Sequence, residues 1–123
     1  MIVAVAVAGG LGAMARFVVD GAVTSRSSCS VPLGTLCVNV SGSCALGFLT
    51  AWWTCQGGSG GGELRPLLAV GFLGGYTTFS TACVESVRLA VDERRKAALL
   101  LALGSYAASL FAAGLGFVAG CMC

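Results

Sequence analysis

The sequence predicts an all-α membrane protein with four transmembrane helices. Of its 123 residues, 57% are apolar and 10% are charged, whereas soluble domains carry about 25% charged residues. The mean hydropathy is +0.93. Because a helix needs about 20 residues to cross the hydrocarbon core of a bilayer, we expect residues 1–123 to form a single four-span transmembrane domain.

The first span, at about residues 2–23, contains two opposite charges near one end. Arg16 and Asp20 are four residues apart, a spacing that places both on one helix face, where they can pair. Glu85 and Arg88, three residues apart, are expected to pair in the same way in the third span. Such pairs either anchor helices at the membrane interface or line an aqueous vestibule, because an unpaired charge inside the bilayer is costly.

The second span, at about 33–55, follows Pro32 and has a strongly polar residue near its middle. This residue is Asn39, with Ser43 one turn later on the same face. Lipid offers no hydrogen bonds, so the amide must find partners in protein or in a water-lined cavity. Asn39 therefore joins helices, as polar residues do in membrane bundles, or lines a pore, and the two roles are compatible.

The third span, at about 65–90, follows a glycine-rich tether, "QGGSGGGE" (56–63). It contains two adjacent glycines, Gly74 and Gly75, followed by a run of hydroxyl side chains. A helix in hydrocarbon can be interrupted only where its freed backbone groups are buried in protein or face an ion or water. Since glycine permits non-helical dihedrals, we predict that the third helix is broken mid-membrane here, around an ion. A Ser/Thr-rich kink without an ion is the alternative.

The fourth span, at about 97–120, has a small residue at every fourth position, which allows another backbone to approach closely. These residues are Gly104, Ala108, Ala112, Gly116 and Gly120. Beside them, Ser105 and Ser109 form a stripe of hydroxyl groups.

The reactive residue types do not favour an enzyme. The chain has no histidine, the usual general base at neutral pH and the commonest metal ligand. Its seven cysteines are odd in number, and cysteines inside apolar segments behave as small hydrophobic residues. Cys121 and Cys123 are the one pair of cysteines close enough in sequence to bind a metal together.

Three segments together resemble the Fluc (CrcB-type) fluoride channel family. They are "GGLGAMARF" (9–17), "PLGTLCVNVSGSCALGF" (32–48) and "GFLGGYTTFST" (71–81), accompanied by Glu85 and the small-residue fourth span. The resemblance implies four-helix subunits that assemble as antiparallel dimers, with two anion pores at the subunit interface. It also implies a central structural Na⁺ held by backbone carbonyls at the break in the third helix.

Carried over residue by residue, the resemblance implies a set of site residues. The Na⁺ carbonyls are those of Gly74 and Thr77, and Arg16 and Glu85 are structural or vestibule charges. An aromatic ring is positive at its edge, so the edge of the Phe79 ring can coordinate a small anion; ordinary packing is the other role open to this side chain. The implied fluoride pathway consists of Asn39, Phe79, Ser80, Thr81, Ser105 and Ser109.

The chain departs from the family pattern at two positions that, by the resemblance, would contact fluoride. The family has a second phenylalanine three residues after the first, where this chain has Ala82. It also has a tyrosine four residues before its fourth-span serine, where this chain has Ser105. We expect the neighbouring Tyr106 to lie on another face, because adjacent helical residues are about 100° apart.

The distribution of basic residues predicts one fixed orientation in the cell membrane. Five basic residues lie on the side of the first and third connections (Arg26, Arg88, Arg94, Arg95 and Lys96), against Arg65 alone on the side of the termini. The positive-inside rule places the richer side in the cytoplasm and both termini outside. An antiparallel homodimer needs insertion in both orientations, so a fixed orientation favours a homologous partner chain of opposite bias.

The sequence thus predicts a fluoride-selective channel subunit that exports fluoride down its gradient and relieves fluoride toxicity, as one member of a heterodimeric pair. One alternative is a non-conducting subunit that supports its partner's pore, which Ala82 favours. The other is a small four-span multidrug exporter, which needs a protonatable carboxylate in the first span. Asp20 is the candidate for that role, but it lies near the end of the span beside Arg16.

Overall fold

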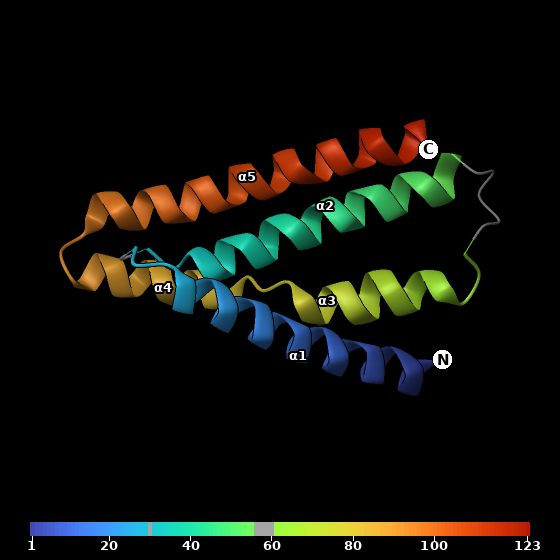
Figure 1. The fold of residues 1–123 in the computed structure, drawn as a ribbon, viewed down its shortest axis with the longest axis horizontal. Helices are drawn as coiled ribbons and strands as arrows, with labels where there is room; N and C mark the ends of the chain where they lie inside the picture. Colours follow the sequence, from blue (N-terminus) through green and yellow to red (C-terminus); the bar gives the residue numbers. More distant parts are fainter. Residues whose placement is uncertain (30, 56–60) are drawn as a thin grey trace.

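The computed structural model describes residues 1–29, 31–55 and 61–123, and these form an all-helical fold (Figure 1). The tether predicted at 56–63 lies largely outside the described residues. In chain order, the elements are α1 (Ile2–Arg26), α2 (Leu33–Cys55), η1 (Pro66–Phe72), α3 (Leu73–Tyr76), α4 (Ser80–Val91) and α5 (Arg95–Met122).

Four helical segments of the described chain are long and apolar enough to cross a membrane. They are Ile2–Arg26, Leu33–Cys55, Pro66–Val91 and Arg95–Met122. Each begins and ends within three residues of its predicted bounds. The predicted fold class is therefore confirmed, and the chain is a multi-pass membrane protein.

The spans alternate in direction, so both termini lie at the same end of the molecule (Figure 1). Helices α2 and α5 run parallel and side by side, and α1 packs against η1 and α3. Large apolar side chains cover much of the outside, among them Phe17, which is 80% exposed, and Leu100, which is 73% exposed. Such a surface suits lipid or another membrane-embedded chain, because neither requires polar groups.

Small residues bring α2 and α5 together, as predicted, but only along the second half of α5. An added Cβ at Gly116 would collide with the carbonyl of Cys44, and one at Gly47 would collide with the carbonyl of Ala113. At Gly104 an added Cβ would meet nothing within 4 Å. The predicted packing face therefore ends before it reaches the first turns of α5.

The role predicted for Gly74 and Gly75 is wrong. Both lie within α3, and the described glycines with positive φ are Gly61 and Gly62 instead. A Cβ at Gly75 would collide with the carbonyl of Gly9 in α1. Glycine is thus needed at position 75 for the close approach of two backbones, not for a non-helical conformation.

The third span begins as a π-helix, which the sequence analysis did not predict. This element, η1, starts at Pro66, as expected for a residue that has no amide hydrogen to donate. The Leu73 N–H, just after η1, donates to the Leu68 carbonyl five residues back. The span is therefore more widely wound than an α-helix just before it reaches the candidate site.

Candidate functional site

The third span leaves its helical path at Thr77. Helix α3 ends at Tyr76, Thr77 has an extended backbone (φ −78°, ψ 156°), and α4 begins at Ser80. The backbone N–H and the hydroxyl of Thr77 both donate to the Leu73 carbonyl, each at 2.9 Å. These two bonds close the last turn before the interruption.

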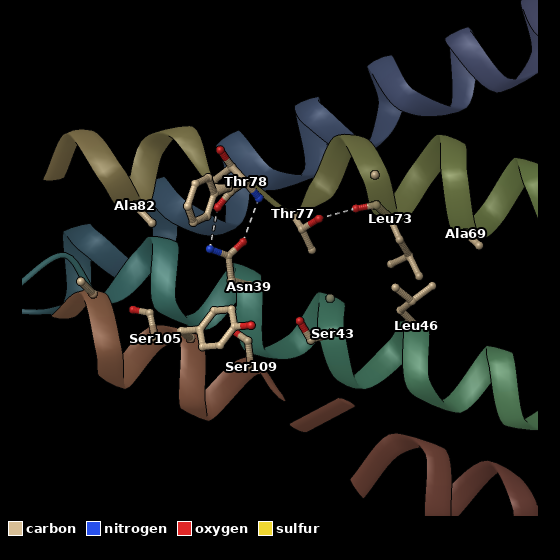
Figure 2. A pocket seen from close by; sticks show the side chains of 15 residues that line it. Asn39, Ser43, Leu46, Ala69, Leu73, Thr77, Thr78, Ala82, Ser105 and Ser109 are labelled. Carbon is tan, nitrogen blue, oxygen red and sulfur yellow. Dashed lines mark hydrogen bonds between the residues drawn. The ribbon is translucent and has the colours of Figure 1, made fainter. Parts of the chain in front are cut away.

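Asn39 from α2 binds the backbone at the interruption. Its Nδ2 donates to the Thr78 carbonyl at 2.7 Å, and its Oδ1 accepts from the Thr78 N–H at 2.8 Å. Figure 2 shows the two bonds, which hold the amide against the non-helical segment. Asn39 therefore joins two spans, and its side chain gives the Thr78 backbone hydrogen-bond partners that the bilayer could not supply.

The Thr78 side chain helps to start α4. Its Oγ1 accepts from the Thr81 N–H at 3.3 Å and donates to the Thr81 hydroxyl at 3.1 Å. The Ser80 hydroxyl lies 3.3 Å from the same Oγ1. The Thr78 hydroxyl thus satisfies one first-turn amide of α4, as a capping side chain does.

These contacts deprive two carbonyls of their helical partners. In an uninterrupted helix, the Gly74 carbonyl would accept from the Thr78 N–H, and the Thr77 carbonyl would accept from the Thr81 N–H. Here the Thr78 N–H donates to Asn39 and the Thr81 N–H donates to the Thr78 hydroxyl. Gly74 is also exposed. The Gly74 and Thr77 carbonyls therefore lack the hydrogen bonds that a continuous helix would give them.

A cavity of about 300 Å³ lies between α2, the interrupted span and α5. It brings together four of the six residues predicted to contact fluoride: Asn39, Phe79, Ser105 and Ser109. Gly74 and Thr77 line it as well, and Figure 2 shows Ser105 and Ser109 projecting from α5. The Phe79 ring is 80% exposed, so it is not an ordinary packing side chain within this subunit.

Two further residues of this cavity bear on the departures from the family pattern. Ala82 lines it together with Phe79, so the position of the missing aromatic side chain does face this space. Tyr106 lines it too, and the expectation that it would lie on another face is wrong. The cavity is wide enough for residues about 100° apart on α5 to border it.

Thr81 belongs to a second cavity, of about 310 Å³, on the other side of the Asn39–Thr78 contact. Arg16 and Asp20 line this cavity, and Thr78 lines both cavities. Ser80 lines neither. The structure therefore separates Thr81 from the four pathway residues of the first cavity, and it leaves Ser80 outside both.

The predicted ion pairs are not formed among the described residues. The Asp20 carboxylate lies against Gly34 in the first turn of α2 instead of pairing with Arg16. This position favours a carboxylate, because the N-terminal end of a helix is partially positive. Glu85, rather than pairing with Arg88, accepts a bond of 3.1 Å from the Thr35 hydroxyl. Its Oε2 is buried and has no hydrogen-bond partner within the described chain.

The sequence analysis missed Thr78 and Tyr106 as site residues. Thr78 stood within the hydroxyl run, but nothing in the sequence showed which residue of that run Asn39 would bind. Tyr106 follows the predicted serine stripe directly, and only the breadth of the cavity brings it into the site.

Comparison with known proteins matches residues 3–117 to the family model described as CrcB-like protein, Camphor Resistance (CrcB). Curated relatives include Fluoride-specific ion channel FluC 1 of Leifsonia xyli subsp. xyli, 52% identical over 94% of this chain and 83% of the relative. Fluoride-specific ion channel FluC 2 of Cutibacterium acnes is 47% identical over 94% of both chains. Fluoride-specific ion channel FluC of Methanopyrus kandleri is 48% identical over 70% of this chain and 63% of the relative.

Proposed function

The chain belongs to the CrcB-like family, and from this membership we propose that it is a fluoride channel subunit that lets fluoride leave the cell down its gradient and so relieves fluoride toxicity. The relatives named as fluoride-specific channels support the choice of ion. The observation that favours it most within the chain is the cavity that Phe79 and Asn39 line beside the interrupted span.

The first cavity, lined by Asn39 and Phe79, suits a small anion that must pass without being trapped. None of the described residues that line it has a charged side chain. The exposed Phe79 ring presents edge hydrogens, which are partially positive, and Ser105 and Ser109 offer hydroxyl donors. Such groups bind an anion strongly enough to replace water and weakly enough to release it.

The second cavity, lined by Arg16 and Thr81, is proposed as the vestibule of the same pathway. Arg16 lines it and forms no ion pair in the described part of the chain, so its positive charge is available to attract an anion. Thr81 adds a hydroxyl group there, and the Ser80 hydroxyl lies 3.3 Å from that of Thr78, a residue that lines both cavities. Glu85, bound to Thr35, is assigned a structural role that connects α4 to α2.

A structural Na⁺ held by the Gly74 and Thr77 carbonyls is part of the proposal. Both carbonyls have lost their helical partners, and oxygen is the ligand type that hard cations prefer. When bound, the cation supplies positive charge that stabilises carbonyl oxygens turned away from helical hydrogen bonds. The exposure of Gly74 is compatible with a cation shared with a second subunit.

The second subunit is proposed to be an antiparallel homologue rather than an identical chain. The excess of basic residues at one end favours a single orientation in the cell membrane, with the termini outside. Ala82 lines the first cavity where the family pattern has a second phenylalanine, so a partner that retains this ring would complete one pore. Relatives named FluC 1 and FluC 2 are consistent with such pairs.

The position of Ala82 also favours a second candidate function, a non-conducting subunit that supports the pore of its partner. The two functions share the fold and the partner, and they differ in whether fluoride passes Phe79 of this chain. A substitution at Phe79 that leaves the flux of the assembled pair unchanged would favour the supporting role.

The test is anion efflux from proteoliposomes that contain this chain and a homologous partner. We expect fluoride to leave the vesicles while chloride is retained. Equal release of fluoride and chloride, or release of neither, would contradict the proposed function. Protein-free vesicles and vesicles with the partner alone provide the two reference rates.

A further inference from the structure

A third cavity, of about 310 Å³, lies between the first half of α5 and the start of α2. We call it the α5 groove, and its lining includes Val31, Leu36, Ala97, Leu101, Gly104 and Ala108. Apart from Ser105, every described residue that lines it is apolar. The groove shares Ser105 with the first cavity and no residue with the second.

The groove exists because the close packing of α2 against α5 ends before the first turns of α5. An added Cβ at Gly116 would collide with the α2 backbone, whereas one at Gly104 would meet nothing within 4 Å. Leu101 belongs to a buried cluster, and Val31 and Ala97 pack against that cluster. Packed side chains therefore form the floor of the groove, while the space beside Gly104 is open.

The groove has the length of one bilayer leaflet and is too narrow for a helix. Ala97 and Ala108 both line it, so it follows α5 for about 16 Å, close to half of the hydrocarbon thickness of about 30 Å. Its volume divided by this length gives a mean cross-section of about 19 Å². A helix about 10 Å in diameter has a cross-section of about 80 Å². A partner helix would therefore lie over the groove, whereas a single hydrocarbon chain fits within it.

Basic side chains lie at the end of the groove where α5 begins. Arg95 and Lys96 are exposed, and they directly precede the groove residues of α5. Lys96 lies one turn before Leu100, which lines the groove, so both lie on the same side of the helix. The first turn of α5 contains no acidic residue, because Asp92 and Glu93 lie in the preceding turn.

We propose that the α5 groove binds one acyl chain of an anionic phospholipid, whose phosphate contacts Arg95 and Lys96. The apolar lining suits the hydrocarbon chain, and the two cations suit the phosphate. Long basic side chains near the ends of membrane helices extend to the interface in this way. In the orientation predicted from the basic residues, this end of α5 faces the cytoplasmic leaflet, where anionic lipids attract such residues.

The proposed lipid site is distinct from the proposed fluoride pathway. Ala108 lines the groove and Ser109 lines the first cavity, and adjacent helical residues are about 100° apart around the axis. A bound acyl chain would exclude water from the groove side of Ser105. The proposal depends on the shape and charge of the groove and not on fluoride conduction, so it can fail or hold independently of the proposed function.

The experiment reconstitutes the full chain into phosphatidylcholine vesicles that contain a small fraction of phosphatidylglycerol with a photoreactive diazirine in its acyl chain. After illumination, mass spectrometry locates the labelled residues. We expect labelling of Leu101 and Gly104 to exceed that of Leu110 and Phe111, which are exposed on α5 outside the groove. The same diazirine carried on phosphatidylcholine should label the groove at least about fivefold less, the factor expected for one basic residue at the surface.

Two glycine variants test whether the open space of the groove holds the chain. Gly104→Leu should lower the labelling of Leu101 at least about tenfold, the factor expected for the loss of about two methylene contacts. Gly114→Leu is the matched control on α5, because an added Cβ there also meets nothing within 4 Å and the residue lies outside the groove. It should leave the labelling unchanged.

A double variant, Arg95→Gln with Lys96→Gln, tests the headgroup contact. It should label the groove equally with the two photoreactive lipids, because the apolar lining remains while the cations are gone.

Three results with the wild-type chain would overturn the proposal. Labelling spread evenly over the exposed residues of α5 would indicate contact with bulk lipid only. Equal labelling of the groove by the two photoreactive lipids would exclude recognition of an anionic headgroup. Loss of groove labelling when a homologous partner chain is added would assign the groove to that chain. None of these measurements depends on the folding of a variant.

Discussion

At the scale of single residues, Asn39 determines how the third span is interrupted. Its amide replaces hydrogen bonds that an unbroken helix would supply to the Thr78 backbone. The opposite orientation of the amide would face donor to donor and acceptor to acceptor, so these two bonds fix which atom is nitrogen. The polar residue of α2 is thus a positioning group as well as a wall of the cavity.

Replacing Asn39 by leucine should destabilise the protein and abolish fluoride flux. The substitution leaves the Thr78 N–H and carbonyl without these partners, at a cost of about 1–3 kcal/mol for each unsatisfied group. Thermal unfolding in detergent and vesicle efflux measure the two effects. Thr50→Ala is the matched control in α2, since within the described residues its hydroxyl bonds only to the Leu46 carbonyl one turn back. Equal stability of the two variants would contradict this role.

Phe79→Ala should slow fluoride efflux without lowering the unfolding temperature. The ring is 80% exposed, so little packing is lost with it. We expect at least about a tenfold decrease in efflux, equivalent to about 1.4 kcal/mol. Phe111→Ala removes a similarly exposed ring that is absent from the lining of the first cavity, and it should leave efflux unchanged. The prediction fails if both variants conduct like the wild type.

The sequence identified the residue types of the site better than their contacts. Asn39 was predicted to join helices or line a pore because an amide in an apolar span must have hydrogen-bond partners. This reasoning holds for any fold. Its partner Thr78 could not be predicted, because the choice depends on how α2 and the third span are placed along each other. The predicted ion pair of Arg16 and Asp20 is absent for a similar reason, because the Asp20 carboxylate lies against Gly34 at the start of α2 instead.

At the scale of elements, glycine contacts set the distance between spans. Gly75 meets the Gly9 carbonyl between α3 and α1, and Gly116 meets the Cys44 carbonyl between α5 and α2. These contacts place the interrupted span between its neighbours. The interruption follows Gly75 directly, so its position depends on this packing.

Gly75→Ala should destabilise the protein by about 1–3 kcal/mol, because the added methyl group would collide with the Gly9 backbone, which cannot move aside as a flexible side chain could. Gly10→Ala should be neutral or stabilising, since an added Cβ there meets nothing within 4 Å and alanine favours helix. The unfolding temperatures of the two variants test the claim. A Gly75→Ala variant as stable as Gly10→Ala would refute close packing at this position.

The spans themselves could be predicted because apolar length and flanking charges determine them almost locally. The π-helix of η1 could not, since nothing in "PLLAVGF" distinguishes it from an ordinary apolar helix. The small-residue repeat of α5 correctly predicted a packing face, but the extent of that face depends on where α2 diverges from it. Sequence spacing alone does not contain that information.

At the scale of the whole molecule, the distribution of basic residues predicts a membrane orientation that labelling can test. Cys123 lies at the end with the termini, and Cys29 lies at the opposite end between α1 and α2. Both are exposed. A membrane-impermeant maleimide added to intact cells should label Cys123 and should reach Cys29 only after permeabilisation. Equal labelling of both in intact cells would contradict a single orientation.

The most direct test of the central claim is the fluoride efflux of proteoliposomes that contain this chain alone, its homologous partner alone, or both together. The account predicts the fastest efflux from the mixture, and it predicts weak efflux from this chain alone that Ala82→Phe increases by restoring the second aromatic edge. It would be contradicted by a mixture that conducts no faster than the partner alone, or by robust efflux from this chain alone that Ala82→Phe leaves unchanged.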